Sequence, residues 1–377
     1  NSELNKPRSL LVGKIKLPFS KFQKKLEAAN KVIDLVLWYR GLLSIGGLWP
    51  TDTRDLKYYT LLVYCFIHAM LVTYDLIMVI GHLGPMIARL RELGLLLIII
   101  ERIILLKYSG SLRKLIREDE ADEAYNHMDA EEKKIYMSYI DIGLRMGKFT
   151  IGFTATSNLL FHFKSFVLYL IAGKKCTTLP MLPYNTRRFF NVTNTRTYLL
   201  VYAYQFPMLY IFMLYVLSSC FMVSFVYHTC GQLSVLAYRI RNTKAAYTIS
   251  VTVLSISRIS KTINGILNRV LYVELIIVTV LLISGLVDAF ILLSNLLYIS
   301  ATILVIYGYC VAGDCITQEC EWYDMAPRYK KSIIICMIRT EIPLYVTGGG
   351  FYIYNSESFT TLVKSSFAYV SMLRQII

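Results

Sequence analysis

The sequence from Val270 to Cys310 is apolar for about 40 residues with almost no charge. As an α-helix this run would be roughly 60 Å long, because a helix rises about 1.5 Å per residue. About 20 apolar residues already cross the hydrocarbon core of a bilayer. The run therefore predicts two consecutive membrane crossings, with the turn between them near Asp288 or near Ser294 and Asn295.

Apolar runs of this kind recur along the whole chain, which has 377 residues, 55% of them apolar, and a mean hydropathy of +0.50. Lipid satisfies no backbone hydrogen bonds, and the runs lack the alternation of barrel strands, so helices are predicted. The fold class expected is an all-α polytopic membrane protein with seven transmembrane helices. The predicted spans are residues 59–83, 93–108, 142–172 and 198–240, two within 270–310, and a last element broken by glycines into 320–341 and 357–377.

The Lys and Arg residues predict the orientation, because cytoplasmic loops retain positive charge. Eleven of them lie within residues 1–57, eight in 107–148 and six in 239–269, all on one predicted side. The loop 174–196 carries five on the other side, but it also holds the sequon Asn191-Val192-Thr193, a glycosylation acceptor in a lumenal loop. We therefore expect a cytoplasmic N-terminus, an extracellular C-terminus and glycosylation at Asn191.

The net charge of +15 is explained by these basic cytoplasmic segments, which also attract anionic lipid head groups. A lipid-facing role is therefore favoured over nucleic-acid binding. Within the N-terminal segment, residues 30–50 are apolar enough to form an interfacial helix on the cytoplasmic side, and a buried extra span is the alternative.

No pattern of catalytic or metal-ligating residues is visible. The histidines are scattered without i, i+4 pairing, and Cys310, Cys315 and Cys320 lack the spacing of zinc ligands. Gly348 to Gly350 are not followed by the Lys and Ser or Thr of a phosphate-binding loop. We predict neither an enzyme nor a metal site, and no cofactor.

The last predicted helix carries hydroxyl groups at membrane depth, where polar side chains are costly and often functional. At 3.6 residues per turn, Thr361, Ser365, Tyr369 and Met372 share one face. A hydroxylated wall that ends in apolar Met372, or in Leu373, suits a cation path with a dewetting constriction. Hydrogen bonding of these hydroxyls to neighbouring helices explains the same pattern as an alternative.

A second concentration of aromatic and weakly polar residues lies at the predicted outer ends of several spans. Such walls suit a small, mostly apolar ligand, because burial supplies affinity and a hydroxyl supplies orientation. Ordinary core packing is the alternative interpretation. The candidate ligand-pocket residues are Leu93, Leu97, Phe153, Ser157, Phe161, Tyr204, Met208, Phe212 and Tyr298.

Four stretches, spread over nearly the whole chain, resemble the insect odorant receptor family. These are Gly46-Gly47-Leu48-Trp49-Pro50, the stretch 228–233, Tyr309-Cys310 with Gly313, and the tail from Trp322 to Gln375. The spacing of Tyr369 and Gln375 is similar to that of the related gustatory receptors, but Ile376 stands where those have Phe. The resemblance therefore favours an odorant receptor, with a gustatory receptor-type channel as an alternative.

The resemblance implies a ligand-gated, non-selective cation channel, opened by a small volatile odorant in the dendrite membrane of a sensory neuron. It also implies a tetramer with a common co-receptor subunit, anchored by a cytoplasmic helix that contains Trp322 and Tyr323, and a pore constriction at Met372. The implied division of the chain is an N-terminal segment 1–57, a ligand-binding bundle 58–313, an anchor 314–341, and the break with the pore-lining helix 342–377.

Two other classes of membrane protein fit less well. A G-protein-coupled receptor would have the opposite charge pattern, and Glu101-Arg102-Ile103 lies in the second span rather than the third. A transporter would show repeated halves with ionisable residues in both. No repeat is visible, and Arg102, Lys164, Glu274 and Asp288 have no obvious partners in the sequence.

Overall fold

The computed structural model describes residues 38–51, 55–120, 128–172, 182–184, 189–190, 194–242, 259, 261–268, 270–276, 279, 293–319 and 345–373. Its helices are α2 (Asp55–Met78), α3 (Leu83–Tyr108), α4 (Gly110–Glu120), α6 (Ala130–Ala172), α7 (Thr195–Gln205), α8 (Met208–Asn242), α10 (Leu293–Glu319) and α12 (Ser356–Leu373). Residues 38–44, 261–268 and 270–276 are also helical. The predictions for Trp322 and Tyr323, Asn191 and Asp288 lie outside the described residues.

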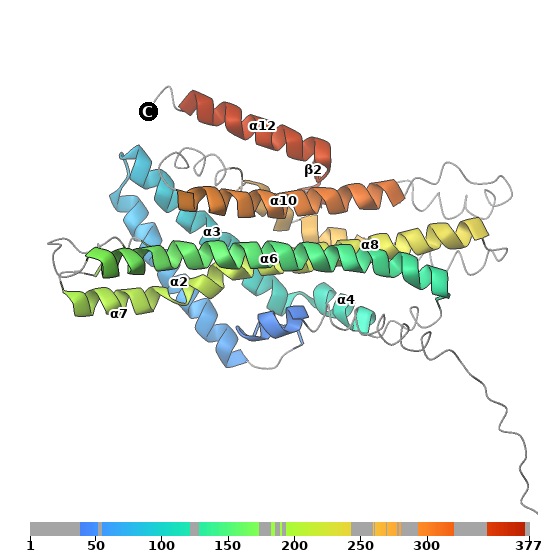
Figure 1. Ribbon diagram of the computed structural model, residues 1–377, viewed down its shortest axis with the longest axis horizontal. Helices are drawn as coiled ribbons and strands as arrows, with labels where there is room; N and C mark the ends of the chain where they lie inside the picture. Colours follow the sequence, from blue (N-terminus) through green and yellow to red (C-terminus); the bar gives the residue numbers. More distant parts are fainter. Residues whose placement is uncertain are drawn as a thin grey trace, which may run out of the picture.

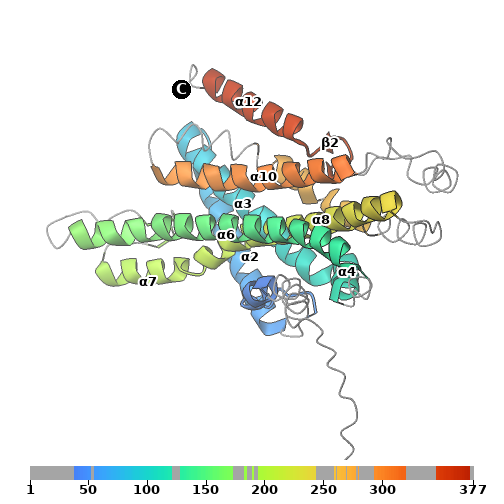
Figure 2. The same ribbon diagram turned by 45° about the vertical axis from the view of Figure 1, so that its right-hand side comes forward.

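The long helices form a bundle in which α6, α8 and α10 run side by side (Figure 1). Helices α2 and α3 pack on each other and cross this layer, and α3 contacts α8. Helix α12 lies at the outside of the bundle along α10, as both Figure 1 and Figure 2 show. The chain is a helical membrane protein, as the sequence predicts.

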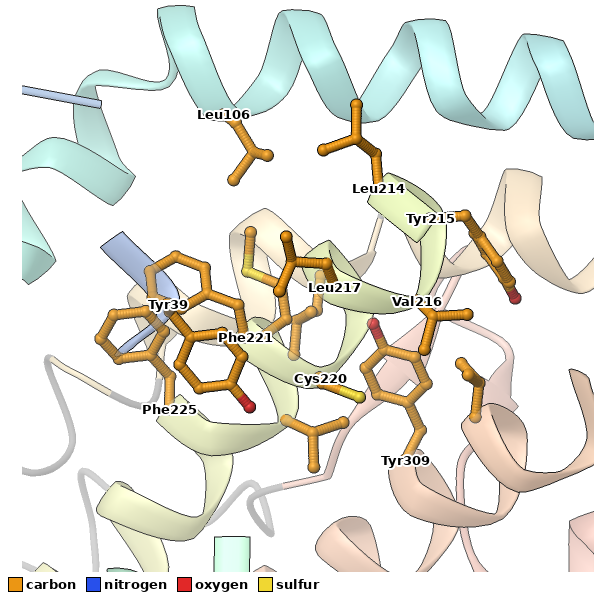
Figure 3. Close-up of a cluster of buried hydrophobic side chains, with 14 of the residues drawn as sticks. Tyr39, Leu106, Leu214, Tyr215, Val216, Leu217, Cys220, Phe221, Phe225 and Tyr309 are labelled. Atoms are coloured by element: carbon orange, nitrogen blue, oxygen red, sulfur yellow. The ribbon is translucent and has the colours of Figure 1, made fainter. Parts of the chain in front are cut away.

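Helix α8 forms the centre of the bundle because it is apolar on every side, and such a helix is buried all round. All residues from Leu214 to Gly231 are buried. Tyr39, Leu106 and Tyr309 come from three other parts of the chain to cover the α8 residues between Leu214 and Phe225 (Figure 3). The core therefore lies around α8.

Two helices among the described residues are long and apolar enough to cross a membrane, Leu56–Met78 and Thr195–Arg239. The second was predicted as one uninterrupted span, but the structure divides it into α7 and α8 at Phe206 and Pro207. Proline has no N–H to donate and its ring clashes with the preceding turn, so the helix is interrupted at this position. The span predicted over residues 198–240 therefore contains a break that the sequence prediction did not include.

The described end of the N-terminal segment packs into the bundle. Tyr39, Leu43, Leu48 and Trp49 are all completely buried, and the Tyr210 hydroxyl donates to the Leu42 carbonyl at 3.0 Å. Both an interfacial helix and a buried extra span would bury these apolar side chains, so the prediction of an interfacial helix for residues 30–50 stays a prediction.

The turn expected near Ser294 and Asn295 is not there, because α10 begins at Leu293 and includes both residues. The glycine-rich break before the last helix is a two-stranded hairpin, in which β1 (Thr347–Gly348) pairs antiparallel with β2 (Tyr352–Ile353). Gly349 and Gly350 have φ angles of 66° and 77°, a conformation that favours glycine, which explains the run of glycines at the turn.

Candidate functional site

A cluster of aromatic rings surrounds Tyr184, in the short described segment between α6 and α7. The ring of Tyr184 lies 5.4 Å from Phe212, 5.9 Å from Phe161, 6.1 Å from His68 and 6.4 Å from His162, measured between centroids. We call these five residues the Tyr184 cluster. Phe161 and Phe212 are two of the residues that the sequence nominated for a ligand pocket, and the structure places both against one ring.

Buried Gln205 of α7 holds the backbone of Tyr184 in place. Its Nε2 donates to the Tyr184 carbonyl at 2.7 Å, and the Tyr184 N–H donates to its Oε1 at 3.3 Å. Gln205 is completely buried, so both bonds are protected from water. Gln205 belongs to the polar and aromatic concentration predicted at the outer end of the fourth span. Tyr184 was not a candidate, because its role depends on a contact between separate segments.

Tyr204 adjoins the cluster through His68. The Tyr64 hydroxyl donates to the Tyr204 carbonyl at 2.7 Å, and the Tyr204 hydroxyl lies 3.4 Å from His68 Nδ1. The other ring nitrogen of His68 lies 3.4 Å from Glu92 Oε1. His68 therefore connects the aromatic cluster and Tyr204 to a charged group on α2 and α3.

That charged group consists of Asp75, Arg89 and Glu92. Arg89 lies 2.5 Å from Asp75 and 3.1 Å from Glu92, and none of the three side chains is more than 12% exposed. A buried charge without a partner of opposite charge is strongly destabilising. Here Arg89 pairs with both carboxylates. The group joins α2 to α3 beside the cluster.

The other nominated pocket residues are more dispersed. Ser157 is buried and donates to the Phe153 carbonyl at 2.9 Å, Met208 is fully buried, and Leu93 packs against the core. Leu97 is 50% exposed, so its side chain does not face the interior of the bundle. Tyr298 lies in α10, but its side chain is not described.

A small cavity lies between α6, α8 and α10, lined by Thr150, Ser219, Cys220 and several glycines. Its volume is about 10 Å³, which is room for one water molecule. An odorant cannot occupy it without movement of the surrounding helices.

The hairpin is attached to the helical segment 261–268 by two asparagines one turn apart. Asn268 accepts from the Gly349 N–H through its carbonyl at 2.9 Å and from the Gly350 N–H through its side chain at 2.7 Å. Asn264 Oδ1 accepts from the Thr347 N–H at 3.2 Å. Asn264 and Asn268 were not candidates, although an Asn pair at i, i+4 is a detectable signal.

The first turn of α12 is fixed to both the hairpin and α10. Asp314 of α10 accepts from the N–H of Ser356 at 3.0 Å and from its hydroxyl. Asn355 caps the helix, because its Oδ1 accepts from the Ser358 N–H at 2.7 Å. The rings of Phe359 and Tyr307 lie 5.5 Å apart, which extends the contact with α10.

Beyond this turn α12 is largely exposed. Thr361, Ser365, Tyr369 and Met372, nominated as pore-lining, are all exposed, and the side chain of Leu373 is not described. The Thr361 hydroxyl donates to the Glu357 carbonyl at 3.0 Å within α12 itself. The alternative in which hydroxyls bond to neighbouring helices therefore does not hold for Thr361.

A buried ion pair joins α3 to the segment 270–276. Arg102 Nη2 donates to Glu274 Oε2, and Glu274 Oε1 accepts from the Tyr215 hydroxyl of α8 at 2.8 Å. The interpretation that Arg102 and Glu274 lack partners was wrong, since each is the other's partner. The Tyr309 hydroxyl lies 3.5 Å from Arg102 Nη2, and the Tyr309 ring makes an edge-to-face contact with Tyr354, at the end of the hairpin, with centroids 5.9 Å apart.

In the first turn of α6, Glu132 forms a bidentate ion pair with Arg239 of α8, with both N to O distances at 2.9 Å. The hydrogen bonds from Arg239 hold the pKa of the Glu132 carboxyl below its usual range. This pair fastens the ends of α6 and α8 together.

The whole arrangement is that of a helical membrane protein with an aromatic cluster at one end and a hairpin-tethered helix along its side. The family model described as 7tm Odorant receptor matches residues 95–367. The chain therefore belongs to the odorant receptor family. Comparison with curated protein sequences gave no match.

Solved structures support the same fold. The insect olfactory receptor OR5 from Machilis hrabei in complex with eugenol matches with a TM-score of 0.74 and 14% sequence identity, over 92% of this chain and 100% of that chain. A second structure of the receptor, whose name mentions no ligand, matches with a TM-score of 0.73 over the same shares. At this identity the likeness establishes the fold.

Proposed function

We propose that this chain is a subunit of an odorant-gated, non-selective cation channel, opened by a small, mostly apolar volatile ligand. The observation that carries the proposal is the attachment of α12. Its first turn is bonded to Asp314 and follows the hairpin, while the hydroxyl-bearing face beyond is exposed. A pore-lining helix needs such a fixed base and an open face.

The proposed ligand site is the region of the Tyr184 cluster together with Tyr204, which lies beside His68. Leu93, Phe153, Ser157 and Met208 stay proposed as further residues of the pocket. Aromatic walls give affinity by burial, and a few hydroxyls orient the ligand. The complex of the Machilis hrabei receptor with eugenol, a small aromatic molecule, supports a ligand of this kind.

The proposed channel is a tetramer that includes a co-receptor subunit. Phe367, Tyr369 and Met372 are each more than half exposed on α12, a surface that the other subunits around a pore would face. Residues 314–341, with Trp322 and Tyr323, would form the anchor between subunits, 342–377 the break and pore helix, 58–313 the ligand-binding bundle, and 1–57 the cytoplasmic segment.

The proposed location is the plasma membrane of a sensory neuron dendrite, with the N-terminus in the cytoplasm. In that orientation the loop with Asn191 is extracellular and open to glycosylation. An N-terminal epitope should then be stained only after the cell is permeabilised, and staining of intact cells would contradict the orientation.

The test of function is whole-cell current in a non-neuronal cell that expresses this chain, with and without the co-receptor, during application of an odorant panel. We expect a fast cation current that depends on the co-receptor and is insensitive to G-protein blockade. Current from the chain alone would remove the co-receptor from the proposal. Silence in both cells, with surface expression confirmed, would contradict the channel function.

A second test separates the ligand site from the pore. Changing Tyr204 to Phe should shift the odorant concentration for half-maximal current, because its hydroxyl contacts His68, and should leave single-channel conductance unchanged. Unchanged potency would remove Tyr204 from the ligand site.

A further inference from the structure

His162 of α6 is a buried polar side chain with no hydrogen-bond partner. The residue is completely buried, and in the part of the chain that the structure describes neither Nδ1 nor Nε2 has a partner. Burial of an imidazole without hydrogen bonds is unfavourable, since its groups lose water and gain nothing. Such a group points to a molecule that is not part of the chain.

The other two buried histidines of the described chain are partnered. His228 lies 2.6 Å from the Tyr136 hydroxyl and 3.0 Å from Gln232 Nε2. His68 has contacts at 3.4 Å on each nitrogen. This fold therefore provides partners for buried imidazoles elsewhere, and His162 is the exception among them.

The hydroxyl of Tyr202 and the side-chain amide of Gln205 form hydrogen bonds with backbone groups and not with the imidazole of His162. The Tyr202 hydroxyl donates to the carbonyl oxygen of His162 at 3.2 Å, although the two rings are only 4.7 Å apart. Gln205 bonds to the backbone of Tyr184. Among the described residues, the rings in contact with the imidazole are those of Phe163, Tyr184, Tyr202 and Phe206.

The ring of Phe206 covers the imidazole of His162 on a side that faces the outside of the bundle. Phe206 lies in the turn between α7 and α8, is 55% exposed, and its ring stands at 80° to that of His162 with centroids 6.0 Å apart. Phe206 is thus an exposed ring in direct contact with the buried imidazole, at a turn between two helices.

We infer that His162 is the hydrogen-bonding group of the ligand site and that it selects neutral volatiles carrying a hydroxyl or carbonyl oxygen. A neutral imidazole has one N–H donor and one acceptor nitrogen, so it can donate to a carbonyl or bond a hydroxyl in either direction. The aromatic walls take the hydrocarbon part of the molecule. A charged ligand is disfavoured, because the contacts of His162 within the described residues are aromatic rings and supply no counter-ion. This inference rests on the proposed function, of which it specifies the ligand class.

The test uses sets of probes with one carbon skeleton: benzyl alcohol, benzaldehyde and toluene, and octan-1-ol, octanal and octane. In cells with the co-receptor, the best oxygenated probe should activate the wild type at about a tenfold lower concentration than its hydrocarbon. His162→Leu should abolish that ratio by weakening the oxygenated probe alone. His162→Gln, which keeps a donor and an acceptor, should retain it to within about threefold.

His228→Leu is the matched control, since it removes a buried imidazole whose partners lie within the protein. It should lower the melting temperature of the purified receptor and leave the oxygen preference intact. His162→Leu should leave the melting temperature without ligand unchanged or higher, because no internal bond is lost. A lower value would mean that His162 is held by a structural water, and would overturn the inference.

A measurement of binding keeps the inference separate from channel function. The same probes should raise the melting temperature of the purified full chain, more for the oxygenated members, and less in His162→Leu. Binding with this pattern but no current would contradict the proposed channel and leave the inference standing. Equal weakening of all probes by His162→Leu, or no probe binding to the wild type, would overturn it.

Discussion

Helices α8 and α12 are both apolar, yet they occupy opposite environments. Every residue of α8 from Leu214 to Gly231 is buried, whereas Ser366 is the only buried residue among the side chains described in α12. Helix α8 packs against α3, α6 and α10, while α12 packs along α10. The difference shows that α8 stabilises the subunit, and that α12 carries a surface which the subunit by itself does not cover.

The largest expected effect on stability comes from breaking the buried ion pair between Arg102 and Glu274, beside α8. Arg102→Ala would leave Glu274 buried without its counter-ion, at a cost of about 3–5 kcal/mol in the free energy of unfolding. We expect little folded protein at the cell surface and a strongly lowered melting temperature. The double variant Arg102→Met with Glu274→Met should be much less affected, and equal loss in both would argue against an ion-pair contribution.

A smaller effect is expected where α8 touches α6. A Cβ at Gly231 would lie 3.1 Å from the Tyr136 side chain and 3.3 Å from its backbone oxygen, so Gly231→Ala should cost about 1–3 kcal/mol. Gly152→Ala on α6 is the control, because open space surrounds that position and alanine favours the helix. A melting temperature that falls equally in both would show that close packing is not the cause.

The Glu132–Arg239 pair should contribute about 1 kcal/mol, and its contribution depends on pH. Because the pKa of Glu132 is lower in the folded protein, the stabilisation is complete above the ordinary carboxyl pKa of about 4.5 and is lost as pH falls toward the lowered value. The melting temperature of the wild type should therefore approach that of Glu132→Gln below about pH 4. A constant difference between the two down to acidic pH would contradict the assignment.

The smallest effect on stability, and a large one on function, is expected in α12. Met372 is 62% exposed in the single chain, so Met372→Ala should change the free energy of unfolding by less than about 0.5 kcal/mol. If Met372 forms the pore constriction, the variant should raise the basal current or alter channel block. Unchanged gating would remove Met372 from the constriction and weaken the contrast between the two helices.

Several elements were predictable from the sequence because their signal is local. Residues 59–83 were predicted as a span and α2 covers Asp55–Met78, while 357–377 were predicted as the last helix and α12 is described over Ser356–Leu373. Helix α6 starts at Ala130, whereas the sequence predicted a start at residue 142. The prediction began too late because the first turns carry Glu131 and Glu132 and resemble a polar loop in the sequence. The turn at Phe206 was missed although Pro207 marks it.

The candidate site was less predictable, because its residues come from separate segments. Phe161, Phe212 and Tyr204 could be nominated as aromatic residues at the ends of spans, but Leu97, chosen by the same reasoning, is half exposed. Tyr184 and His162 carried no signal of their own. Their importance arises from ring contacts with α7 and α8 and, for His162, from the lack of a partner among the described residues.

The sequence by itself determined that this chain is a bundle of membrane helices, because the length and hydropathy of a segment decide whether it can cross a bilayer. It also placed a glycine turn before the last helix. Only the tertiary structure decided that Arg102 pairs with Glu274, that Asn264 and Asn268 receive the hairpin, and that α8 is enclosed while α12 is not. Hydropathy belongs to one segment, whereas a partner or a covered face exists only once separate segments are packed together.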